Sequence, residues 1–228
     1  ARRFVTDLGF PAEYAGFGGD RRPPVLAVEG PINLPPLHDY QLFVTSRIKA
    51  LVRGEGPARG MVSLPTGAGK TRVAVEALID EIRDGNLGGV LIWIAQSDEL
   101  CEQAVQTWSD VWRAVGPARS LTISRFWNSN TLVEEPGTVQ LVVATPDMLR
   151  GIVDDPAYAW LTEASVVIVD EAHRSVAPQY TRVLKWLGRG RGRKDPRKLI
   201  GLTATPFRNT NKIETARLIR RYDSNRLD

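Results

Sequence analysis

The sequence has a single cysteine, Cys101, and only two histidines, His38 and His173, among its 228 residues. One thiol cannot form an internal disulfide, and two imidazoles with one thiol are too few for a zinc cluster. No run approaches the roughly 18 apolar residues that a membrane-spanning helix requires, and the N-terminus lacks the apolar core of a secretory signal peptide. We therefore expect a cytoplasmic protein without membrane contact, in which any metal ion arrives with a substrate.

The sequence has fewer acidic residues than basic ones, 26 Asp and Glu against 30 Lys and Arg, which gives a net charge of +4. This surplus suits a polyanionic partner, but it is also common in proteins that bind no nucleic acid. Much of it lies in one glycine-containing segment, which carries Lys185, Arg189, Arg191, Arg193, Lys194, Arg197 and Lys198. The segment is either a loop that follows nucleic-acid phosphates or a solvated surface, and its composition favours neither.

Proline and glycine are dense in residues 1–36, which we interpret as an N-terminal arm without a regular core element. Beyond the arm, apolar runs of strand length alternate with amphipathic stretches. The runs are Met61–Leu64, Val90–Ala95, Leu121–Ile123, Val139–Ala144, Val166–Val169 and Leu199–Leu202. The expected helices are Asp39–Val52, Thr71–Arg83, Asp98–Val115 and Pro178–Leu187.

This alternation predicts one α/β domain over residues 37–210, with a parallel sheet covered by helices on both faces in three layers. Ligands of such sheets bind beyond the carboxyl ends of the strands. The polar motifs of this sequence follow the apolar runs directly, so we expect them to meet at that edge.

The first motif joins the run at Met61–Leu64 to a helical pattern. It reads Pro65, Thr66, Gly67, Ala68, Gly69, Lys70 and Thr71. Glycines at these positions let backbone N–H groups wrap phosphates at a helix N-terminus, the lysine reaches the β- and γ-phosphates, and the threonine ligates Mg²⁺. The general phosphate-loop pattern has glycine where this chain has Leu64. The segment predicts an ATP-binding loop.

The second motif begins where the run Val166–Val169 ends, at Asp170 and Glu171. A lone Asp-Glu pair often only caps a turn, but its coexistence with a phosphate loop favours catalysis. Asp170 is then a magnesium ligand, and Glu171 is the base that orients and deprotonates the attacking water.

The string Asp170-Glu171-Ala172-His173 resembles the DEAH form of motif II in superfamily 2 helicases and translocases. Further segments resemble the family's other motifs in the same order: Leu37–Gln41, Ala95–Gln103, Val143–Leu149 and Leu202–Pro206. The resemblance implies the first RecA-like domain of a P-loop NTPase, closest to the branch that contains restriction-enzyme motor subunits.

The resemblance also implies roles for single residues. It makes Gln41 the reader of the adenine edge, although a glutamine on a helix surface is the simpler alternative. It makes His173, Thr203 and Thr205 a relay between the ATP site and the nucleic-acid cleft. The implied nucleic-acid contacts are Gln96, Ser97, Thr145 and Pro146. Thr145 could equally be a plain helix cap, and Asp98 is an acid where the family often has a basic residue.

The function that we expect is Mg²⁺-dependent ATP hydrolysis that drives movement on nucleic acid, with DNA preferred by the branch resemblance. Restriction or phage defence is the setting that the branch suggests. Family members take their transition-state arginines from a second RecA-like domain, so we interpret residues 211–228 as the helical start of a connection to that domain. The alternatives are a nucleotide-dependent switch without productive turnover, a small-molecule kinase or an RNA-directed helicase.

Overall fold

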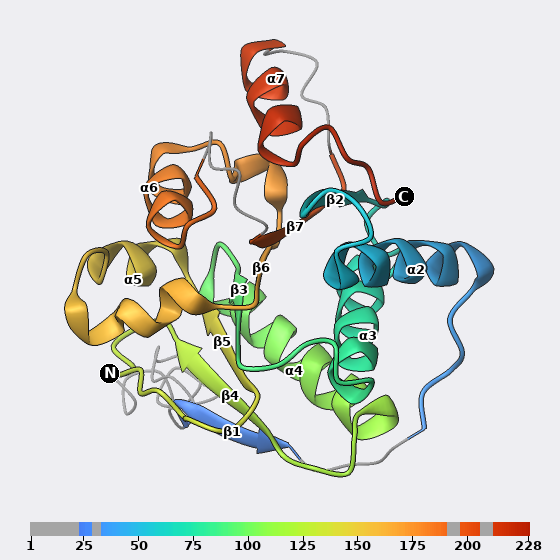
Figure 1. Cartoon of the computed structure of the whole chain (residues 1–228), viewed down its shortest axis with the longest axis horizontal. Coiled ribbons are helices and arrows are strands. Elements are labelled where there is room, and N and C mark those ends of the chain that lie inside the picture. Colours follow the sequence, from blue (N-terminus) through green and yellow to red (C-terminus); the bar gives the residue numbers. More distant parts are fainter. Residues whose placement is uncertain (1–22, 29–32, 191–196, 206–211) are drawn as a thin grey trace, which may run out of the picture.

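The computed structural model describes residues 23–28, 33–190, 197–205 and 212–228, and these form a seven-stranded sheet with helices around it (Figure 1). The strand order is β1-β4-β5-β3-β6-β7-β2. The strands are β1 (Val25–Val28), β2 (Arg59–Ser63), β3 (Val90–Ile94), β4 (Leu121–Phe126), β5 (Gln140–Ala144), β6 (Val166–Val169) and β7 (Lys198–Thr203). The helices are α2 (Asp39–Arg53), α3 (Lys70–Arg83), α4 (Asp98–Val115), α5 (Pro146–Gly151), η2 (Pro156–Glu163), η3 (Ala172–Arg174), α6 (Pro178–Trp186) and α7 (Lys212–Arg221).

All six apolar runs form strands, and the four expected helices form with ends that differ by one residue at most. Every pairing among β2 to β7 is parallel. The exception to the sequence interpretation is β1, which pairs antiparallel with β4. Our expectation that the first 36 residues contain no regular core element was therefore wrong for residues 25–28. Val28 is fully buried in this strand despite the prolines around it.

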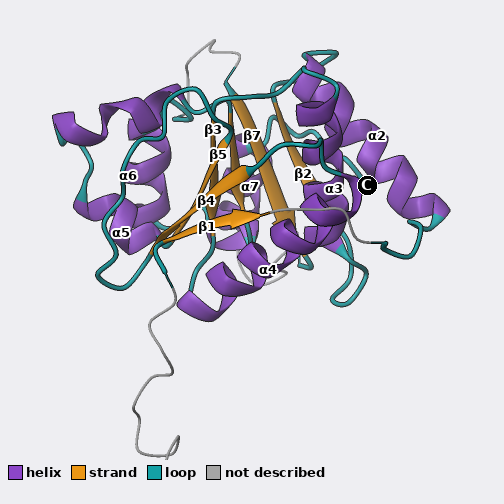
Figure 2. Ribbon diagram, turned by 90° about the horizontal axis from the view of Figure 1, so that it is seen from below, coloured by secondary structure: helices purple, strands orange, loops and turns teal. Residues whose placement is uncertain are grey.

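Helices cover both faces of the sheet, as Figure 2 shows. Side chains alternate between the two faces along each strand, so Leu91 and Trp93 of β3 join one core cluster and Ile92 and Ile94 join the other. The first cluster is completed by α2, α3 and α4, and the second by α5, η2, α6 and α7. The predicted three-layer α/β architecture is confirmed.

The last described segment returns to the sheet instead of continuing as a helix. After α7 the chain turns at Asp223 and Ser224, both with positive φ, and Arg226 forms a parallel bridge with Met61. The Asp228 carboxylate then accepts a hydrogen bond of 2.8 Å from the backbone N–H of Ser63. The segment thus covers the edge of β2, the strand that precedes the phosphate loop.

Within the part of the chain that the structure describes, no helix is both long enough and apolar enough to cross a membrane.

Candidate nucleotide site

The two ATP motifs and the relay residues follow three neighbouring strands, β2, β7 and β6. The phosphate loop follows β2, Thr203 ends β7, and Asp170 comes directly after β6. Parallel strands bring their carboxyl ends to one edge of the sheet, so segments that are more than a hundred residues apart in sequence meet there.

The phosphate loop has the backbone shape that its glycines predict. Gly67 and Gly69 adopt left-handed φ angles of 80° and 78°, a region that costs a residue with a Cβ about 1–2 kcal/mol. Gly69 caps the N-terminus of α3, and Lys70 is the first residue of that helix. The Lys70 ammonium donates to the carbonyl oxygen of Pro65 at 3.2 Å. The lysine can exchange this neutral acceptor for a phosphate without a change in the loop.

The side chain of Gln41 connects the start of α2 to the phosphate loop. Its Nε2 donates to the carbonyl oxygen of Ala68 at 3.1 Å, and its Oε1 accepts from the backbone N–H of His38 at 2.9 Å. An amide has two hydrogens and two acceptor positions, so one of each is left over, as reading an adenine edge requires. Gln41 is buried, which excludes the alternative of a helix-surface glutamine.

The Tyr40 hydroxyl reaches the same Ala68 oxygen at 3.3 Å, a contact that the sequence did not indicate. Successive residues of a helix point about 100° apart. Tyr40 and Gln41 can therefore both donate to the Ala68 oxygen only because the phosphate loop bends toward the start of α2.

Asp170 occupies a site that disfavours its charge. Burial raises the pKa of its carboxyl group, while the hydrogen bond from the Glu171 N–H and the charge of Lys70 lower it. That hydrogen bond measures 2.9 Å to Oδ1. The lysine of the phosphate loop follows β2 and the acid follows β6, at the same edge of the parallel sheet.

Glu171 has a left-handed backbone, with φ 48° and ψ 51°, which is uncommon for a residue other than glycine. Its carboxylate lies 3.2 Å from Nδ1 of His173. The same nitrogen lies 3.2 Å from the Thr203 hydroxyl and 3.5 Å from that of Thr205. A carboxylate only accepts hydrogen bonds, so Nδ1 of His173 carries a hydrogen when it faces Glu171.

Oxygen ligands for a hard cation are present in the Thr71 hydroxyl and the Asp170 carboxylate. Among the described residues, no cluster of three or more His, Cys, Asp or Glu side chains could hold a metal by itself. Mg²⁺ is usually held by one or two protein oxygens together with water and substrate phosphates. This donor set therefore fits a magnesium ion that arrives with ATP.

The residues assigned to nucleic acid have mainly local roles in this structure. The Ser97 hydroxyl caps α4 by accepting from Leu100 N–H, and the Thr145 hydroxyl caps α5 by accepting from Met148 N–H. The alternative of Thr145 as a helix cap is thus what the structure shows. Pro146 is buried at the start of α5, whereas Gln96 is exposed at the end of β3.

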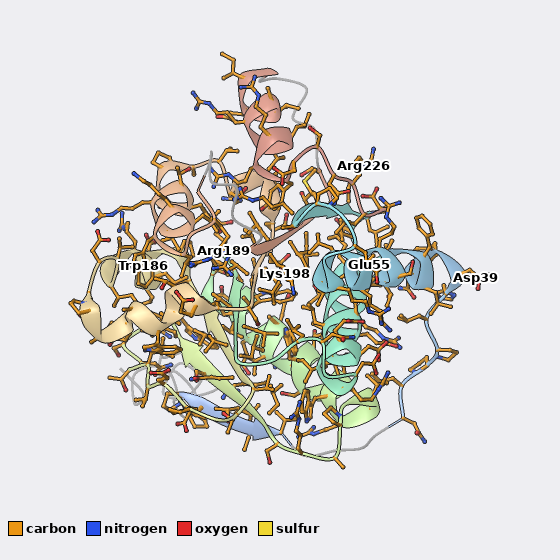
Figure 3. The ribbon with its side chains drawn as sticks, viewed as in Figure 1. Asp39, Glu55, Trp186, Arg189, Lys198 and Arg226 are labelled. Carbon is orange, nitrogen blue, oxygen red and sulfur yellow. The ribbon has the colours of Figure 1, made fainter. Side chains whose placement is uncertain are left out.

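The basic segment is also partly structural. Arg189 is 1% exposed and lies inside the molecule (Figure 3), where it donates to the carbonyl oxygens of Leu187, Ala164 and Thr162. Arg197 donates to the Thr162 oxygen at 2.7 Å. The alternative of a solvated surface is therefore wrong for Arg189. Arg191, Arg193 and Lys194 lie outside the described residues.

A phosphate loop and an acid pair beyond neighbouring parallel strands define a P-loop NTPase. Residues 34–208 match the family described as "Type III restriction enzyme, res subunit". The match covers most of the chain, and the chain belongs to this family. Its fold is that of the first RecA-like domain of superfamily 2 helicases.

Among curated proteins, an ATP-dependent DNA helicase mph1 of Neurospora crassa is 28% identical over 178 residues. The match covers 77% of this chain but only 14% of that protein.

Among solved structures, the Hef helicase domain of Pyrococcus furiosus aligns over 82% of this chain and 36% of its own, with 21% identity and a TM-score of 0.60. The UvsW helicase of bacteriophage T4 aligns over 95% and 72%, with 14% identity and a TM-score of 0.56. At these identities the structural likeness shows the fold alone.

Proposed function

We propose that the chain is the ATP-binding and ATP-hydrolysing motor domain of a superfamily 2 DNA helicase or translocase. The observation that carries the proposal is the meeting of the phosphate loop and the Asp170-Glu171 pair at one edge of the sheet, where Glu171 is linked through His173 to the end of β7. The restriction-subunit family and the DNA helicase names of the relatives support DNA as the track. Restriction or phage defence in the cytoplasm is the setting that we propose.

Each residue has a separate task in this mechanism. Lys70 leaves the Pro65 oxygen and binds the β- and γ-phosphates, while Thr71 and Asp170 hold Mg²⁺, which neutralises charge on the phosphate oxygens when it is bound. Glu171 orients the attacking water and accepts its proton. Gln41 reads the adenine edge with its remaining donor and acceptor.

His173 connects hydrolysis to the rest of the domain. Its Nδ1 lies within 3.5 Å of the Glu171 carboxylate and of the hydroxyls of Thr203 and Thr205, which therefore share one ring nitrogen. A displacement of the segment after β7 therefore changes the hydrogen bond that positions Glu171. We propose this as the path between nucleic-acid binding and hydrolysis, with a second RecA-like domain that supplies the transition-state arginines.

Two substitutions test the site. Lys70→Ala removes a charge-assisted contact to phosphate, so Mg-ATP binding should weaken by at least about tenfold. Glu171→Gln keeps the shape of the side chain but cannot take a proton, so binding should persist while any measured hydrolysis falls by about 100-fold or more. Isothermal titration measures the binding, and phosphate release measures the hydrolysis.

Lys185→Ala and Glu55→Gln serve as matched controls, since both side chains are exposed and outside this site. The controls should behave as the unmodified chain. Unchanged ATP binding in Lys70→Ala would sink the proposal, and unchanged hydrolysis in Glu171→Gln would show that another group is the base.

A further inference from the structure

A cavity of about 370 Å³ lies between η3, α6 and α7, and His173 is one of its lining residues. Its walls include Arg174, which follows His173, and Arg217 of α7. Both arginines are exposed. Within the described residues, neither guanidinium makes a hydrogen bond or an ion pair. Two cations from different elements thus line one cavity.

The cavity also adjoins the first turn of α6, through Ala177, Pro178, Gln179 and Tyr180. The N-cap residue is Ala177, which has no side chain that can cap the helix. The amides of Gln179 and Tyr180 have no acceptor inside the helix, and no described group outside it accepts from them. An uncapped helix N-terminus attracts anions through these N–H groups and the helix dipole.

Tyr180 gives an independent indication of a missing partner. The side chain is 1% exposed, and its hydroxyl is buried without a hydrogen-bond partner among the described residues. Buried hydroxyls are nearly always hydrogen-bonded in folded proteins. Glu214 also lines the cavity, but it has an interaction of its own. The three charged side chains, Arg174, Arg217 and Glu214, together carry one net positive charge.

We propose that this cavity binds a backbone phosphate of nucleic acid, held by Arg174, Arg217 and the amides at the start of α6. The guanidinium fork matches the oxygens of a phosphate, and the nucleic-acid partner itself rests on the proposed function. Because His173 lines the cavity and also contacts Glu171, an occupied cavity would lie one side chain away from the catalytic base.

Binding of a fluorescent oligodeoxythymidylate to the 228-residue chain, followed by anisotropy without nucleotide, tests the site. The double variant Arg174→Gln/Arg217→Gln should bind about tenfold more weakly. The slope of log affinity against log salt should also fall by about 0.7 for each lost contact with a single strand.

The matched control is Arg182→Gln/Arg220→Gln, which removes the same charge from exposed positions of α6 and α7 that do not line the cavity. Its affinity for the oligonucleotide should stay within about twofold of that of the unmodified chain, because it loses only general surface charge. Equal weakening in both double variants would mean general charge attraction and overturn the cavity as a site. Unchanged binding in the Arg174/Arg217 variant would also overturn it and favour an acidic protein segment as the occupant.

Amide NMR gives a second readout that needs no substitution. The N–H signals of Gln179 and Tyr180 should shift when the oligonucleotide is added, and unshifted signals at saturation would overturn the proposal. If the unmodified chain binds no oligonucleotide at all, both the cavity proposal and DNA as the track fail. The ATP-binding test with Lys70→Ala contains no nucleic acid and is decided separately.

Discussion

Asp170, which we propose as a magnesium ligand, has a carboxyl group whose pKa is raised in the folded chain. Its carboxylate is mostly removed from water beside the equally acidic Glu171, and both conditions raise its pKa, burial more strongly. Lys70 offsets only part of this effect. The arrangement is unfavourable in the free protein, but it leaves a poorly solvated carboxylate ready for a divalent cation.

Asp170→Asn should therefore raise the melting temperature of the ligand-free chain by a few degrees at neutral pH. The asparagine oxygen can still accept from Glu171 N–H, and it carries no charge to bury. Since the folded state raises the pKa of Asp170, the unmodified chain gains stability as pH falls from the raised pKa toward the ordinary carboxyl value. The difference in melting temperature between Asp170→Asn and the unmodified chain should therefore become smaller as pH falls over that same range.

Differential scanning calorimetry across pH measures the effect. The control is Asp110→Asn on α4, whose side chain is 57% exposed and which should change little. A variant that melts below the unmodified chain at neutral pH would show that the Asp170 charge stabilises the fold.

For single residues, the sequence indicated which side chains are candidates for the site, but not which groups they contact in the folded chain. The sequence singled out Gln41 and His173 as site residues, but their contacts with Ala68 and Thr203 depend on how separate elements approach one another. Arg189 was misjudged because composition does not show that its guanidinium donates to carbonyl oxygens at the ends of α6 and η2.

At the scale of elements, β1 depends on one buried ion pair. Arg125 of β4 donates to both carboxylate oxygens of Glu102 in α4, at 3.1 and 3.3 Å. Its remaining nitrogen donates to the Pro23 carbonyl oxygen at 2.9 Å. The arginine thereby joins the segment before β1 to the helix beneath the sheet, which explains how a strand with only one fully buried residue stays paired.

Arg125→Leu should destabilise the domain by about 3 kcal/mol, because it leaves the Glu102 charge buried without this partner. Hydrogen exchange should accelerate at the amides of β1 far more than at those of β5. The double variant Arg125→Leu/Glu102→Leu should recover part of the stability, since it also removes the buried charge of Glu102.

Arg113→Leu on the surface of α4 is the matched control, with a side chain that is 42% exposed. Equal exchange at β1 in Arg125→Leu and in this control would show that the ion pair does not hold the strand.

The same strand explains where pattern reading worked and where it failed. Central strands such as β3 and β6 are buried on both faces and therefore read as unbroken apolar runs. The edge strand β1 is only four residues long, and just one of them, Val28, is fully buried. It pairs with β4, and Arg125 of β4 also bonds to the Pro23 carbonyl oxygen before β1. Local composition could not reveal a partner that lies about a hundred residues away.

At the scale of the whole molecule, the described residues contain the groups that we propose bind and orient ATP. They are gathered at one edge of the sheet, and the segment at Arg226–Asp228 pairs beside the strand that leads into the phosphate loop. We propose, from the resemblance to superfamily 2 helicases, that the transition-state arginines come from a second RecA-like domain. Ground-state binding and transition-state stabilisation therefore belong to different parts of the proposed motor.

We expect the 228-residue chain to bind Mg-ATP and to hydrolyse it very slowly, with no unwinding of a duplex. Lys70, Thr71, Asp170 and Glu171 position the phosphates, but the charge that develops in the transition state lacks the arginines, which contribute about 10³–10⁵ in rate in related NTPases. Binding to DNA should be weak and steeply dependent on salt, since one domain neutralises few phosphates. Turnover is measured with and without single- and double-stranded DNA, beside a longer form that adds a second RecA-like domain. Equal turnover in the two forms, with equal stimulation by DNA, would show that this domain alone completes the catalytic site.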